Sequence, residues 1–249
     1  MITFKNSKIQ ISIILAVEFL MGIYIALTRI NTAEALTLFS VFSEIREGVG
    51  IDITSQLVDI NILISILNVL ISVPLISSLF NKKYLAKCCY IATRQKSYFK
   101  FYIREIIDIF LVCVLSGILY NAGILTVTLF KHSNAFDTAD INLFFAAIAN
   151  SIIIVFTITI LGTLISALLN DKIGIIVTSI FVAVLSLSVF FIPYKFKQLN
   201  IISWYFTDLF INEKALFPYP IYTYYLAVSA IDIILLLIGG GLLKKRDVL

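Results

Sequence analysis

The segment KKYLAKCCYIATRQKSYFKFYIR, residues Lys82–Arg104, separates two apolar segments that are each long enough to cross a membrane. It contains seven Lys or Arg residues, and the first acidic residue after them is Glu105. Short loops rich in Lys and Arg stay on the cytoplasmic side of a membrane, so we expect this segment there. Lys96, Lys100 and Arg104 recur every four residues, which places them on one face of a helix. The segment therefore predicts a short amphipathic helix whose cationic face meets the cytosol or the lipid headgroups.

The composition indicates a membrane protein with several spans. Of the 249 residues, 60% are hydrophobic and 14% are charged, and the mean hydropathy is +1.03. Soluble domains have about 45–50% apolar and about 25% charged residues. The pI of 8.9 comes from Lys and Arg that flank apolar segments, so it does not predict a nucleic-acid partner. Three cysteines and the single histidine, His132, predict neither a disulfide framework nor a metal site.

Six apolar segments approach the ~20 residues with which a helix crosses ~30 Å of hydrocarbon. The sequence therefore predicts an all-α fold in one transmembrane domain, residues 1–249. The spans are expected at about 9–28, 59–80, 106–130, 143–169, 173–193 and 222–243. Lys5 and Lys8 precede the first span without a small-residue cleavage site, so we expect this span to be retained.

The distribution of charge predicts the orientation of these spans. With the N-terminus in the cytoplasm, the cytoplasmic pieces hold 13 of the 19 Lys and Arg residues, whereas the outer pieces hold 6, beside eight acidic residues. Both termini are therefore expected in the cytoplasm. The basic segment itself has two open interpretations: a topology signal without a partner, or a docking element for a cytosolic protein.

Two acidic residues lie near the middle of predicted spans. Glu18 is central in the first span and Asp232 in the last. A charge at this depth costs about 2.5–3.5 kcal/mol on insertion scales, so each carboxyl group is expected to be protonated, paired or facing water. A functional role and a structural hydrogen bond to a neighbouring helix both remain open for them.

The second span carries a polar stripe. Its members are spaced four, three and four residues apart and therefore share one helix face: Asn61, Ser65, Asn68 and Ser72. Because lipid does not solvate such a stripe, we expect it to face another helix, a second subunit or a water-filled path. Gly239-Gly240-Gly241 near the end of the last span allows either close helix approach or bending, and the sequence does not decide between them.

Several enzyme classes lack their motifs in this chain. The sequence contains no G-x-x-x-x-G-K-[ST], no H-E-x-x-H and no G-x-S-x-G. We therefore expect no catalytic residues and no ATP hydrolysis by the chain itself. Three classes remain: a transport subunit, a membrane-bound immunity or sensor protein, and an intramembrane enzyme without a recognised motif.

Four features carry a resemblance to a known family. They are the basic loop YIATRQKSYFKFYIRE, the glycine-rich last span ending LLKKRDVL, the two spans joined by NDK, and the long outer connection before the last span. Together they resemble the six-span permease subunits of bacterial type-2 ABC exporters. They resemble especially the small permeases linked to peptide export and self-immunity, such as those that export phenol-soluble modulins or lantibiotics.

The resemblance implies how such a chain would work. The basic loop would hold a coupling helix between the second and third spans, and this helix would dock a cytosolic ATPase through Arg94, Lys96, Tyr98, Lys100 and Arg104. ATP and Mg²⁺ would bind to that ATPase, with no cofactor in this chain. Two permeases, identical or paralogous, would pair in the bacterial plasma membrane among its lipids, and the polar stripe would line or border the cavity between them. The cargo would be an amphipathic or antimicrobial peptide or a lipid-like molecule. The alternative is a bacteriocin-immunity or sensor protein that does not transport.

Overall fold

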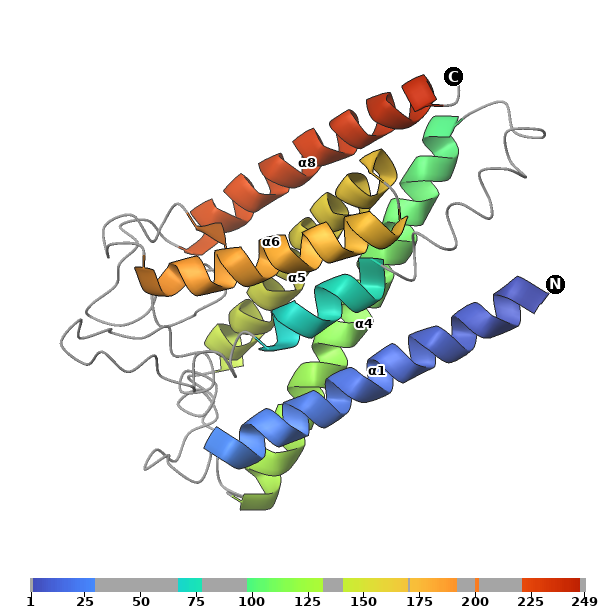
Figure 1. The fold of residues 1–249 in the computed structure, drawn as a ribbon. Helices are drawn as coiled ribbons and strands as arrows, with labels where there is room; N and C mark the ends of the chain where they lie inside the picture. Colours follow the sequence, from blue (N-terminus) through green and yellow to red (C-terminus); the bar gives the residue numbers. More distant parts are fainter. Residues whose placement is uncertain are drawn as a thin grey trace.

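The computed structural model describes residues 2–29, 67–77, 98–131, 141–169, 171–191, 200–201 and 221–246. These residues form helices and contain no strand (Figure 1). The helices are α1 (Ile2–Arg29), the short helix Leu67–Ser77, α4 (Tyr98–Lys131), α5 (Ile141–Leu168), α6 (Asp171–Phe191) and α8 (Ile221–Arg246). The all-α prediction is confirmed for this part of the chain.

Four of the described helices are long and apolar enough to cross a membrane, which makes the chain a membrane protein. Their apolar segments are Lys8–Thr28, Tyr102–Lys131, Ile148–Ile165 and Thr223–Gly241. They correspond to the first, third, fourth and sixth predicted spans. The described apolar segments Leu67–Ser77 and Ile173–Ser188 are shorter, and most of the predicted second span lies outside the described residues. The count of six spans therefore stays a prediction.

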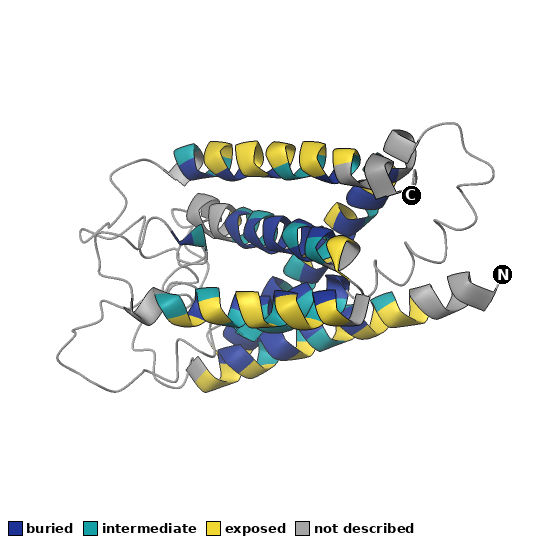
Figure 2. Cartoon of the chain, turned by 45° about the horizontal axis from the view of Figure 1, so that its top comes forward, coloured by how far each residue is buried: buried dark blue, intermediate teal, exposed yellow. Residues whose placement is uncertain are grey.

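The long helix α4 crosses the bundle and joins its parts. It contacts α1 on one side and both α5 and α8 on the other, while α5 and α6 pack as an antiparallel pair (Figure 1). The main core draws apolar side chains from every described helix, including Ile14, Val73, Ile109, Ile158, Val182 and Tyr224. The outward faces of α1 and α8 are exposed along most of their length (Figure 2). Those faces carry Leu, Ile and Tyr side chains, as expected of a surface solvated by lipid.

Basic residues gather at one end of the bundle. At this end α1 begins, α4 begins, the α5–α6 turn lies and α8 ends (Figures 1 and 2). The Lys and Arg residues of these helix ends are Lys5, Lys8, Lys100, Arg104, Lys172, Lys244, Lys245 and Arg246. At the opposite end, the described helices carry Arg29 and Lys131. The predicted orientation requires both termini on one side of the membrane, and this arrangement is consistent with it.

The predicted coupling helix is continuous with the third span over the part that the structure describes. α4 starts at Tyr98, before the expected span boundary at Ile106, and runs to Lys131 without interruption. No Gly or Pro occurs from Tyr98 to Ile106, so the sequence gives no signal that would end a helix there. Tyr98, Lys100 and Arg104 therefore lie in the first turns of α4, whereas Arg94 and Lys96 lie outside the described residues.

Two glycines let α1 and α4 pack backbone to backbone. A methyl group on Gly22 would overlap the carbonyl oxygen of Tyr120, and one on Gly123 would overlap the carbonyl oxygen of Phe19. Small residues at such crossings let membrane helices approach closely, where lipid offers no hydrophobic force to drive association. This crossing fixes α1 against α4 one helical turn after Glu18.

Candidate functional site

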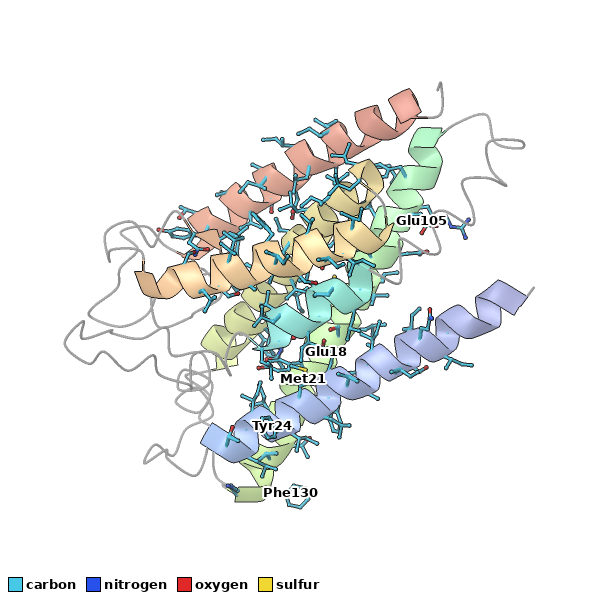
Figure 3. The ribbon with its side chains drawn as sticks, in the orientation of Figure 1. Glu18, Met21, Tyr24, Glu105 and Phe130 are labelled. Atoms are coloured by element: carbon cyan, nitrogen blue, oxygen red, sulfur yellow. The ribbon has the colours of Figure 1, made fainter. Side chains whose placement is uncertain are left out.

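Glu18 is fully buried on the inner face of α1, with 0% of its surface exposed. The buried residues Ile14, Glu18, Met21 and Ile25 are spaced four, three and four residues apart and so lie on one side of the helix. This side faces the short helix Leu67–Ser77 and α4, so the helical repeat itself carries the carboxyl group inward. Figure 3 shows Glu18 between α1 and the rest of the bundle.

Ser72, in the described part of the predicted polar stripe, contacts this carboxyl group. The Ser72 hydroxyl lies 2.5 Å from Oε1 of Glu18, 2.6 Å from the backbone oxygen of Asn68 and 2.5 Å from Oδ1 of Asn68. Asn68 and Ser72 are 3% and 0% exposed, respectively. At Ser72 the stripe therefore faces a helix of the same chain. Asn61 and Ser65 lie outside the described residues.

Helices α4 and α5 supply further described residues near Glu18. The Ser116 hydroxyl of α4 lies beside the carboxyl group. One turn earlier on α4, the buried thiol of Cys113 lies beside Thr159 of α5, whose hydroxyl donates to the backbone oxygen of Val155 at 2.6 Å. We name these buried side chains the Glu18 cluster: Glu18, Asn68, Ser72, Cys113, Ser116 and Thr159.

The other central acid, Asp232, has separate surroundings. It is 9% exposed on α8 and lies beside Thr157 of α5. The Thr157 hydroxyl donates to the backbone oxygen of Ile153 at 2.9 Å. Sequence reasoning grouped Glu18 and Asp232 as central acids, and the structure places them in contact with different partners on different helices.

Among the described predicted docking residues, Arg104 is exposed at the basic end of the bundle. Two residues earlier, Tyr102 points inward: its ring packs so tightly on Gly239 of α8 that a methyl group there would overlap the phenol oxygen. Leu164 of α5 lies at the same point, whereas a methyl group on Gly241 would meet nothing within 4 Å. The lack of a side chain at Gly239 therefore allows Tyr102 and Leu164 to approach α8 closely.

Some members of the Glu18 cluster were missed from the sequence. Cys113 and Ser116 belong to a buried row on α4 that continues through Tyr120 and Ile124 at helical spacing. The available signal was the recurrence of polar or small residues at these intervals in an apolar segment, which would have indicated a buried helix face. In the described ranges, no three His, Cys, Asp or Glu side chains gather as a metal site requires. The cluster offers one carboxyl group among hydroxyl, amide and thiol groups, which suits it to binding a proton.

Comparisons of the chain with protein-family models, with curated protein sequences and with solved structures give no significant match.

Proposed function

We propose that the chain is the membrane-spanning subunit of an ATP-driven type-2 ABC exporter whose ATPase is a separate chain. The support is the resemblance of the basic loop, the NDK-joined spans and the last span to such permeases, together with the membrane-length helices. Two copies would pair, and the cargo would be an amphipathic or antimicrobial peptide.

The continuity of α4 is the observation that carries this proposal. Its first turns hold Tyr98, Lys100 and Arg104, and further along the same helix Cys113 and Ser116 belong to the Glu18 cluster. The step from Arg104 to Ser116 is about 18 Å along a helix that rises 1.5 Å per residue. A partner that pushes on the start of α4 would therefore act directly on the buried contacts between α1, the short helix and α4.

The basic end of the bundle suits a cytosolic partner. The starts of α1, α4 and α6 and the end of α8 all lie at this end (Figure 1), and the side chain of Arg104 is exposed. Under the positive-inside rule this end faces the cytoplasm, where an ATPase would be found.

One observation favours the second candidate, an immunity or sensor protein without transport. Ser72 is hydrogen-bonded to both Asn68 and Glu18 inside a single chain. As an exporter, the chain would have to move α1 away from the short helix before these residues could border a path. An immunity or sensor protein would need no such movement.

The test is capture of a P-loop ATPase by the tagged chain from its native membrane. Lys96→Gln and Lys100→Gln leave five of the seven basic residues of the loop, enough to keep it cytoplasmic. Partly exposed charges are worth about 0–1 kcal/mol each, and an aromatic interface anchor such as Tyr98 about 2 kcal/mol or more. The triple variant with Tyr98→Ala should therefore insert normally and lose the ATPase.

A matched control removes two charges from the opposite end, through Arg29→Gln and Lys131→Gln, and should capture the ATPase as the wild type does. Equal capture by the triple variant would place the docking site elsewhere, first at the α5–α6 turn. Capture of no ATPase by the wild-type chain would favour the immunity or sensor candidate.

A further inference from the structure

The Ser72 hydroxyl has more oxygen neighbours than its single hydrogen can serve. Three oxygens lie within 2.6 Å of it: Oε1 of Glu18 and the backbone and side-chain oxygens of Asn68. A hydroxyl group donates once and accepts at two lone pairs. A backbone carbonyl never donates, so the Ser72 hydrogen belongs on the Asn68 carbonyl oxygen four residues earlier, a common bond for serine in helices. With that hydrogen on the Asn68 carbonyl oxygen, Ser72 accepts at both of its lone pairs. One bond then comes from the Asn68 amide, turned so that its nitrogen faces Ser72, and the other comes from Glu18, which carries a hydrogen only as the carboxylic acid.

The other carboxyl oxygen of Glu18 supports the same assignment. Oε2 is buried and has no hydrogen-bond partner among the residues that the structure describes. Burying an ionised carboxylate oxygen without a donor or a cation costs far more than burying the carbonyl oxygen of a neutral acid. Around Glu18, the short helix presents Asn68 and Ser72, α4 presents Ser116 and Cys113, and Thr159 of α5 lies behind Cys113. Cys113 is the titratable member of this set, and none of these side chains carries a positive charge.

We propose that Glu18 is a proton-binding site within the membrane, neutral while α1 packs on the short helix and α4, and ionised when these helices separate. In the packed bundle the acid donates to Ser72. On separation its O–H bond breaks, the proton passes to water as hydronium, and the carboxylate remains on α1. This inference does not depend on the proposed export, because it follows from the surroundings of Glu18 alone.

The fold ties this proton to the packing of α1. Gly22 follows Glu18 by one helical turn, and its backbone contacts that of Tyr120 on α4. Among the described residues, opening this crossing would expose the carboxyl group to water from the α4 side. Since the packed state holds the proton and the opened state does not, acidic conditions favour the packed state and its stability falls as the pH rises.

Infrared spectroscopy of the purified chain in vesicles of ether lipids, which lack carbonyl groups, tests the proposal. The carbonyl stretch of a carboxylic acid is then separate both from the lipid bands and from the bands of carboxylates. At neutral pH the wild type should show this band, and Glu18→Gln, which keeps the size and a donor for Ser72, should lose it. Asp232→Asn is the matched control and should keep the Glu18 contribution. If Glu18→Gln does not insert, Ser72→Ala provides the assignment, because loss of the hydrogen-bond partner shifts the frequency of the Glu18 band.

Exchange into heavy water tests the coupling to helix packing. The Glu18 band should shift slowly in the wild type and about tenfold faster or more in Gly22→Ala, which forces α1 from α4. A wild-type spectrum without a carboxylic acid band, or a band that neither Glu18→Gln nor Ser72→Ala alters, would overturn the proton site. Equal exchange rates in the wild type and Gly22→Ala would overturn its link to the α1–α4 crossing.

Discussion

Replacing Gly22 by Ala tests the backbone contact between α1 and α4. The new methyl group would overlap the carbonyl oxygen of Tyr120 and lie 3.2 Å from the amide nitrogen of Ile124. Both atoms belong to the backbone of α4, so no change of rotamer relieves the overlap and the two helices must move apart. Overpacking of this kind typically costs about 1–3 kcal/mol, and the rigid neighbours favour the upper half of that range.

Gly241→Ala is the matched control for this substitution. Both glycines lie within helices, so both changes gain the same helix propensity, up to about 1 kcal/mol. A methyl group on Gly241 meets nothing within 4 Å, so that variant should be as stable as the wild type or more stable. The difference between the two variants in free energy of unfolding therefore isolates the overlap, and we expect about 2 kcal/mol.

The free energy of unfolding is measured with a denaturing detergent in mixed micelles. Two further variants should give intermediate or combined effects in the same measurement. Gly162→Ala should fall between the other two, because its methyl group would meet side-chain atoms, Cγ2 of Thr178 at 2.6 Å and Oγ of Ser77 at 2.9 Å. Gly22→Ala combined with Gly123→Ala should cost less than the sum of the single changes, because one separation of the helices relieves both overlaps. Equal unfolding free energies for Gly22→Ala and Gly241→Ala would refute the backbone contact between α1 and α4.

Two other predictions concern orientation and the basic end. In a cysteine-free background, Asn134→Cys and Lys214→Cys should react with an impermeant maleimide on whole cells and Ser97→Cys should not; labelling of Ser97→Cys from outside would reverse the proposed orientation. Tyr102→Phe removes a buried hydroxyl that has no partner among the described residues, so the free energy of unfolding should be unchanged or raised. Gly239→Ala should lower the free energy of unfolding by about 1–3 kcal/mol. Tyr102→Phe should restore part of the stability lost in Gly239→Ala, and a complete lack of rescue would contradict the contact.

From the sequence, the polar residues that need a partner inside the membrane could be predicted, but the contacts between them could not. Glu18 and the pair Asn68 and Ser72 were identified separately as polar groups that lipid would not solvate. Their contact depends on how α1 aligns with the short helix, and the periodicity of either helix carries no information on that alignment. The apolar pattern does not help, because lipid and protein interior are equally apolar: Ile109 is buried and Leu111 is exposed on the same helix.

The start of α4 and the role of its glycines were harder to predict for related reasons. The apolar run that marks the third span begins at Ile106, and a basic helical segment before it looks the same in sequence whether it continues the helix or precedes it. The sequence around Gly123 does not reveal its role, since a glycine in a membrane helix can lie at a close helix crossing or contact no other helix. Only the partner backbone at Phe19 distinguishes the two.

The position of the Gly22–Gly123 crossing makes α4 an unequal lever. At 1.5 Å per residue, Gly123 lies about 37 Å from the start of the helix at Tyr98 and about 12 Å from its end at Lys131. If α4 tilts as a rigid rod about this fulcrum, its basic end sweeps about three times as far as its opposite end. Such a tilt would turn a large displacement of the basic end into a smaller displacement of the opposite end.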